Sequence, residues 1–125
     1  MNKVFLLTGG NLGNRLHNLQ KAVEWVEREC GRIVSQSSVY ETAPWGFSEQ
    51  PLFLNQALEI ETQLLPQDLL KNILQIEEQM GRRRVMKLGP RVIDIDILLM
   101  DDLVLESAQL TIPHPHMKER RFVLM

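Results

Sequence analysis

Residues 89–99 read GPRVIDIDILL, a run in which acidic and branched apolar side chains alternate after a glycine and a proline. Successive side chains of a β-strand point to opposite faces, so a strand here puts Asp94 and Asp96 on one face. The opposite face then carries Ile93, Ile95, Ile97 and Leu99. We therefore predict a strand that packs its apolar face into a core and leaves its acidic face open.

The acidic face of this strand is expected to attract a cation. Aspartate is disfavoured in strands, and two carboxylates ~7 Å apart repel by about 2 kcal/mol at an effective dielectric of about 20. Mg²⁺ offsets this repulsion, because it binds carboxylate oxygens and completes its shell with water and substrate phosphates. Asp94 and Asp96 are therefore candidate ligands of one or two Mg²⁺ ions. A solvated strand face with an incidental acidic pair is the alternative.

Composition and charge predict a small globular protein. With 125 residues, 44% hydrophobic and 24% charged, the chain can bury about two-thirds of its unfolded surface in one domain over 1–125. Its apolar stretches fall short of the ~20 residues of a membrane span, and its first residues lack a signal-peptide pattern. The single cysteine, Cys30, is expected to pack as a small apolar group. A net charge of −2 argues against nucleic-acid or membrane partners, and we expect a cytoplasmic monomer.

Hydrophobic periodicity predicts alternating strands and helices. Strand patterns occupy 4–8, 33–40 and 52–64, helical patterns 12–30 and 66–81, and a hairpin return 103–105. The first helical stripe comprises Leu12, Leu16, Leu19, Val23, Val26 and Cys30, and the second comprises Leu69, Ile73, Ile76 and Met80. Pro66 suits a first helical turn, and Gly31 and Gly81 suit helix ends. We predict an α+β, ferredoxin-like antiparallel sheet with helices packed on one face and the other face free for a ligand.

A basic connection precedes the acidic strand. Residues 81–91 contain Arg82, Arg83, Arg84, Lys87 and Arg91 without an acidic residue among them. Arginine suits a polyphosphate because its planar fork donates to two phosphate oxygens and keeps its charge. Beside two candidate Mg²⁺ ligands, this connection favours a lid over a metal-bound polyphosphate. A basic loop without a ligand is the alternative.

Other side chains point to a flat, polar ligand. Phe53 and Asn55 share a strand face, after a loop that contains Trp45, and an aromatic ring beside an amide suits a heterocycle. Core packing of Phe53 is the alternative. His114 suits a phosphate contact better than a metal, because it has no cysteine or third histidine nearby. Glu77 flanks the second helical stripe and is either half-buried and paired with a ligand or an arginine, or solvated.

Six segments together resemble one known family. They are GGNLGN (9–14), ETAPWG (41–46), FLN (53–55), ExxxGRRR (77–84), KLGPRVIDIDIL (87–98) and LTIPHPHMKERRF (110–122). The chain thus resembles the 6-hydroxymethyl-7,8-dihydropterin pyrophosphokinases of folate biosynthesis, and GPRxxDxD is a highly specific motif of that family. The resemblance implies pyrophosphate transfer from ATP to the hydroxymethyl oxygen of the pterin, with release of AMP.

The resemblance also implies roles for individual residues. Asp94 and Asp96 would hold two Mg²⁺ ions that bridge the ATP phosphates, and Arg82 and Arg91 would assist catalysis. The implied ATP site comprises Glu77, Arg82, Arg84, Arg91, Ile97, Thr111, His114 and Arg120. The implied pterin site comprises Thr42, Ala43, Trp45, Phe53, Asn55 and Phe122. In that site Phe53 and Phe122 would sandwich the ring while Asn55 bonds its edge.

The chain departs from the family pattern at a few positions. Leu88 stands where the family has an aromatic residue, Phe53 where tyrosine is frequent, and Gln109 where a basic residue is expected. The chain stops at Met125, so we expect a domain without the usual C-terminal segment of the family. A nucleotidyltransferase, an RNA-binding module and a binding-only relative are the rival interpretations.

Overall fold

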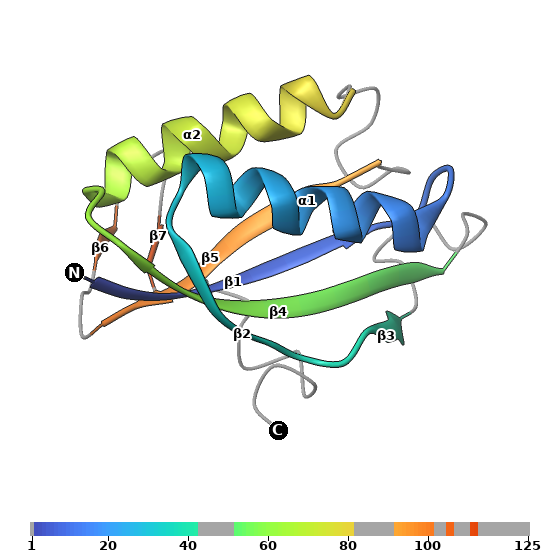
Figure 1. Cartoon of the computed structure of the whole chain (residues 1–125), viewed down its shortest axis with the longest axis horizontal. Helices are drawn as coiled ribbons and strands as arrows, with labels where there is room; N and C mark the ends of the chain where they lie inside the picture. The colour runs from blue at the N-terminus through green and yellow to red at the C-terminus, as the bar shows by residue number, and fades with distance from the viewer. Residues whose placement is uncertain (1, 43–51, 82–91, 102–104, 107–110, 113–125) are drawn as a thin grey trace.

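Two helices cover one face of an antiparallel sheet (Figure 1), in a computed structural model that describes residues 2–42, 52–81, 92–101, 105–106 and 111–112. The strands are β1 (Asn2–Gly10), β2 (Arg32–Gln36), β3 (Tyr40–Thr42), β4 (Phe53–Thr62), β5 (Asp94–Met100), β6 (Leu105–Glu106) and β7 (Thr111–Ile112). The helices are α1 (Arg15–Glu29) and α2 (Pro66–Gln79). The predicted α+β fold, with an antiparallel sheet and both helices on one face, is confirmed.

The strand order explains how distant segments meet. The sheet runs β2-β4-β1-β5 with antiparallel neighbours, and the short strand β3 also pairs with β4. Each helix therefore connects two strands that have a third strand between them, as in ferredoxin-like folds. Residues 103–104 of the predicted hairpin return lie outside the described residues, and Leu105, its last residue, pairs with Ile112 of β7 in a separate two-stranded sheet.

The core lies between the sheet and the two helices. It is built from Val4 and Leu6 of β1, Leu58 and Ile60 of β4, Ile95 and Ile97 of β5, Leu19, Ala22 and Val26 of α1, and Leu69, Ile73 and Ile76 of α2. Cys30 is also buried in this core, as predicted. Leu99 does not share the face of Ile97, because a register shift between Phe5 and Leu6 pairs Leu99 with Phe5 and brings Met100 into the core.

Local chemistry sets the ends of both helices. Helix α1 begins at Arg15 rather than near Leu12, because Asn14 caps it by accepting a hydrogen bond from the His17 backbone N–H at 3.1 Å. The first predicted turn of the apolar stripe is therefore partly wrong, and Leu16 is about half exposed (49%). Helix α2 has Pro66 in its first turn and is followed by Gly81 at φ +90°, as its sequence predicts.

The expected strand over 33–40 divides into β2 and β3 around Ser37. The Ser37 backbone N–H donates to the Ala57 carbonyl at 2.9 Å, and the Ser37 hydroxyl accepts from the Ala57 N–H at 2.9 Å. A serine hydroxyl that takes the place of a backbone acceptor interrupts the regular ladder. Both halves stay beside β4, so β3 reaches the end of the sheet where β4 begins.

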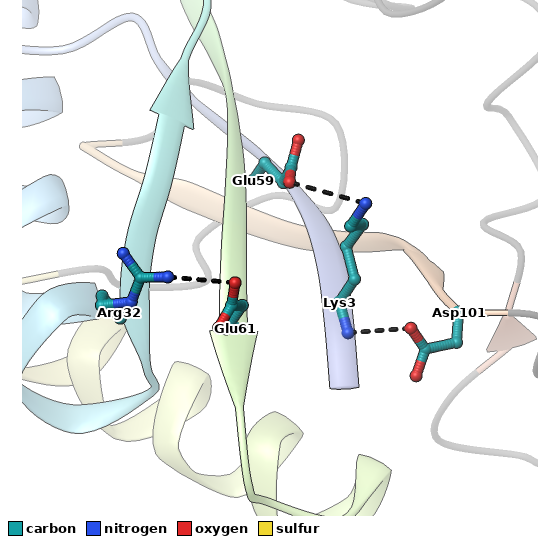
Figure 2. A network of polar contacts seen from close by, with 5 residues as sticks. All are labelled: Lys3, Arg32, Glu59, Glu61 and Asp101. Atoms are coloured by element: carbon teal, nitrogen blue, oxygen red, sulfur yellow. Dashed lines mark hydrogen bonds and ion pairs between the residues drawn. The ribbon is translucent and has the colours of Figure 1, made fainter. Parts of the chain in front are cut away.

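Charged pairs occupy the other end of the sheet (Figure 2). The Arg32 guanidinium lies 3.0 Å from the Glu61 carboxylate, and the Lys3 ammonium lies 3.9 Å from that of Glu59. The Lys3 backbone N–H donates to the Asp101 carboxylate at 2.8 Å. At this end of the open face, the described basic and acidic side chains therefore lie close to one another as ion pairs.

Candidate functional site

One row of positions crosses four strands on the face that the helices leave open. In the strand register Tyr40 of β3 lies opposite Asn55 of β4, Asn55 opposite Gly9 of β1, and Gly9 opposite Asp94 of β5. Adjacent strands are about 4.8 Å apart, so the backbones of Asn55 and Asp94 are separated by about 10 Å. The open face thus brings the predicted pterin and metal residues within the span of a small ligand.

The two aspartates share this open face. Asp96 lies two residues after Asp94 and opposite Leu7, and both aspartates are half-buried. Within the residues described, no cluster of three or more His, Cys, Asp or Glu side chains is available to hold a metal. Two carboxylates nevertheless fit Mg²⁺, which is bound by one or two carboxylates and takes its remaining oxygens from water and phosphates. The donor set therefore suits a metal that arrives with a nucleotide.

Three predicted pterin residues meet where β3 ends and β4 begins. Thr42 lies opposite Phe53, and the Asn55 side-chain N–H donates to the Thr42 hydroxyl at 2.6 Å. Asn55 is buried, whereas Thr42 and Phe53 are half-buried. A half-buried ring beside an oriented amide can stack a heterocycle and bond to its edge.

Gly9 keeps the middle of this row open. A Cβ atom at this position would lie 2.5 Å from the Asn55 side-chain oxygen and 3.3 Å from the Leu54 carbonyl oxygen. The Asn55 amide therefore occupies the space that the side chain of any residue other than glycine would need at position 9. The strand expected over 4–8 stops short of Gly9, and only the register of Gly9 in the longer strand β1 shows its place in the site.

Glu77 and Ile97 lie behind the open face. Glu77 is 4% exposed, and its carboxylate accepts a hydrogen bond from the Ile95 backbone N–H at 2.8 Å. Of the two alternatives for Glu77, burial is confirmed, and pairing with a ligand or an arginine stays a prediction. Ile97 packs in the core on the helix side. Both residues lie on the helix side of the sheet, so neither side chain is on the open face. Glu77 holds the backbone of β5 between Asp94 and Asp96.

The remaining predicted site residues lie outside the described part of the chain. They are Ala43, Trp45, Arg82, Arg84, Arg91, His114, Arg120 and Phe122. Thr111 is described only through its backbone in β7, which lies next to β5. Their roles stay predictions.

Comparison with known proteins identifies the family of this chain. Residues 5–125 match the family described as 7,8-dihydro-6-hydroxymethylpterin-pyrophosphokinase (HPPK). The chain belongs to the HPPK family. It is 45% identical over 122 residues to the 2-amino-4-hydroxy-6-hydroxymethyldihydropteridine pyrophosphokinase of Aquifex aeolicus, covering 98% of this chain and 76% of that protein. It is 44% identical over 124 residues to the Bacillus subtilis protein of the same name, covering 98% and 74%.

Some longer proteins match this chain over only a small part of their own length. The folic acid synthesis protein FOL1 of Dictyostelium discoideum is 45% identical over 124 residues, which cover 99% of this chain but only 19% of that protein. The fold of this chain also matches a crystal structure of Plasmodium falciparum HPPK-DHPS with pteroate, at a TM-score of 0.76 and 19% identity. That match covers 98% of this chain and 38% of the other, and it supports the fold alone.

Proposed function

We propose that this chain transfers pyrophosphate from ATP to the hydroxymethyl group of 6-hydroxymethyl-7,8-dihydropterin, releasing AMP, on the open face of its sheet. HPPK family membership over residues 5–125 carries this proposal. The register that aligns Asn55, Gly9 and Asp94 supports it, because both substrates need a place on one surface. The activity serves folate synthesis, and ATP is the co-substrate.

The pterin is assigned to the side of the face formed by β3 and β4. Phe53 would stack on the ring, and the amide of Asn55, already oriented by Thr42, would bond to its polar edge. Phe122, Ala43 and Trp45 complete this site in the proposal. Such contacts hold the hydroxymethyl oxygen in line with the β-phosphorus of ATP, and correct placement of reactants supplies much of a rate enhancement.

The nucleotide is assigned to the side of the face formed by β5. Asp94 and Asp96 would hold two Mg²⁺ ions, which when bound neutralise charge on the phosphates of ATP. Arg82, Arg84 and Arg91 would bind the same phosphates, and Glu77, Ile97, Thr111, His114 and Arg120 would complete the site. Glu77 contributes by fixing the backbone of Ile95, and therefore the direction of both aspartates.

The reaction needs no nucleophile from the protein. The pterin hydroxyl oxygen forms a bond to the β-phosphorus, the bond from that phosphorus to the bridging oxygen of AMP breaks, and the hydroxyl proton leaves to solvent. Phosphoryl transfer depends on positioning and on stabilisation of charge, which the residues proposed above supply. Small molecules are the substrates, and we propose a monomer without nucleic-acid or membrane partners. No helix in the described residues is long and apolar enough to cross a membrane.

A product assay tests this function. The purified chain is mixed with ATP, Mg²⁺ and the reduced pterin alcohol, and the nucleotide products are separated over time. Formation of AMP and a pterin diphosphate in equal amounts is expected. Release of pyrophosphate with transfer of AMP would instead identify a nucleotidyltransferase. Absence of turnover with tight binding of both substrates would identify a binding-only relative.

A further inference from the structure

We propose that Arg15 is a positioning residue for the pterin side of the open face. Its guanidinium fastens the end of β3 to the start of β4 and so holds Thr42 against Phe53 and Asn55. The inference rests on the proposed function, because the pterin is the ligand expected to report this placement.

A single nitrogen of Arg15 contacts β3 and the residue that precedes β4. Arg15 Nη1 donates to the Glu41 carboxylate at 3.1 Å and to the Leu52 backbone carbonyl at 2.9 Å. Glu41 directly precedes Thr42, and Leu52 directly precedes Phe53. We call Arg15, Glu41 and the Leu52 carbonyl the Arg15 clamp. It sits within one residue of two positions assigned to the pterin.

Strand β3 depends on such a clamp because it is short. It has three residues, and its register within the described residues is with β4 alone. Ser37 fastens the chain before β3 through its two hydrogen bonds with Ala57. At the far end of β3, the Arg15 clamp adds a contact on the helix side to the pairing of Thr42 with Phe53 and to the Asn55–Thr42 hydrogen bond on the open face.

The clamp acts from behind the ligand. Side chains alternate along a strand, so Glu41 points away from the face that carries Tyr40 and Thr42, toward the start of α1. Among the described residues, Arg15 is therefore placed to affect the pterin through Thr42, Phe53 and Asn55. This distinguishes it from a residue that contacts substrate.

Removal of Arg15 tests the hydrogen bonds rather than core packing. The Arg15 side chain is 32% exposed and lines an open hollow of about 490 Å³ with Asn11, Leu12, Gly13, Glu41 and Leu52. Truncation of a side chain that already borders solvent leaves no enclosed cavity, so the cost of a core cavity does not arise. The expected loss is that of one charge-assisted pair and one bond to a carbonyl.

The test compares Michaelis constants for the two substrates. In Arg15→Ala we expect the KM for the pterin alcohol to rise about three- to tenfold, with the KM for ATP and kcat changed less than about twofold. Arg15→Lys keeps a charged donor and should recover part of this loss. Glu41→Ala leaves the bond to Leu52 and should have a smaller effect. In the double variant the two effects should be less than additive, because both residues belong to one contact.

Arg32→Ala is the matched control. This variant removes the ion pair between Arg32 and Glu61 of β4, whose length of 3.0 Å is similar to that of the Arg15–Glu41 pair (Figure 2). The Arg32–Glu61 pair lies at the opposite end of the sheet from the Arg15 clamp. The KM of this variant for the pterin should equal that of the unmodified chain. An equal rise in this control, or a rise in the KM for ATP as large as that for the pterin, would overturn the inference.

Hydrogen exchange separates this inference from the proposed function. If the unmodified chain forms no AMP, the proposed function fails, yet the exchange of backbone amides in Tyr40–Thr42 still reports the clamp. Faster exchange there in Arg15→Ala than in Arg32→Ala would support the clamp. Equal exchange rates in both variants would refute it, whatever the chain catalyses.

Discussion

At the scale of single residues, Asp96 gives the most direct test of the carboxylate site. We expect Asp96→Asn to lower kcat by at least about 100-fold, since one of two proposed metal carboxylates is lost. The measurement is AMP formation against Mg²⁺ concentration at saturating substrates. Asp101→Asn is the control, because Asp101 directly follows the same strand and its carboxylate accepts from the Lys3 backbone N–H (Figure 2). Its φ of +47° is one that asparagine tolerates. Normal turnover of Asp96→Asn at limiting Mg²⁺ would remove the metal assignment.

Gly9 provides a second test at this scale, on the pterin side. The Cβ of Gly9→Ala would meet the Asn55 oxygen at 2.5 Å, so the amide must move away from the position that Thr42 now fixes. Such overpacking costs about 1–3 kcal/mol, and we expect the KM for the pterin to rise about tenfold or more. Steady-state kinetics with the pterin varied provide the measurement.

Gly31→Ala separates this effect from general destabilisation. A Cβ at Gly31 also meets β4, at the Glu61 carbonyl oxygen, but at the end of the sheet remote from the pterin residues. Both variants should unfold at lower urea concentration, whereas only Gly9→Ala should raise the KM for the pterin. Similar kinetic effects in the two variants would contradict the role assigned to Gly9.

At the scale of elements, Glu77 joins α2 to β5. Its buried carboxylate accepts from the Ile95 N–H at 2.8 Å, so Glu77→Ala leaves a buried backbone donor without that partner. This should cost about 1–3 kcal/mol in the free energy of unfolding. It should also raise the Mg²⁺ concentration needed for half-maximal rate, because Ile95 lies between the two aspartates.

Glu77→Gln is the matched variant for this prediction. Glutamine keeps an oxygen acceptor of the same reach, so both stability and Mg²⁺ dependence should stay closer to those of the unmodified chain. The measurements are urea unfolding and AMP formation against Mg²⁺. If Glu77→Ala loses stability but keeps its Mg²⁺ dependence, Glu77 is only a packing residue.

At the scale of the whole molecule, periodicity was enough to predict the order of the two helices and of the strands that they connect. The alternation around Asp94 and Asp96 predicted β5, and the stripe through Leu69, Ile73 and Ile76 predicted the buried face of α2. These predictions succeed because burial of apolar groups on one face is a property of local sequence. The shared face of Phe53 and Asn55 follows from the same rule.

Features that depend on tertiary contacts could not be predicted in this way. The break at Ser37 arises from its hydrogen bonds to Ala57, and the exchange of Leu99 for Met100 in the core arises from a register shift against β1. The Arg15 clamp likewise joins segments that are distant in sequence. The Asn55 amide occupies the space at Gly9 only because β4 pairs with β1. No local pattern of apolar residues encodes such pairings, so the details of the site emerge only when the sheet is assembled.

The buried thiol of Cys30 makes the stability of the whole fold depend on pH. Burial, with a smaller contribution from the charge of Glu29, raises the pKa of its thiol from 9.0 to about 12. Above about pH 9 the unfolded chain therefore loses a proton that the folded chain keeps. The contribution of the Cys30 thiol to the free energy of unfolding is therefore fully present below about pH 9 and is lost as the pH rises toward 12. Relative to Cys30→Ala, which retains every other titrating group, the unmodified chain should lose about 1.4 kcal/mol more unfolding free energy between pH 8 and 10. Urea unfolding at both pH values measures this difference, and equal losses in the two proteins would mean that the thiol titrates alike in both states.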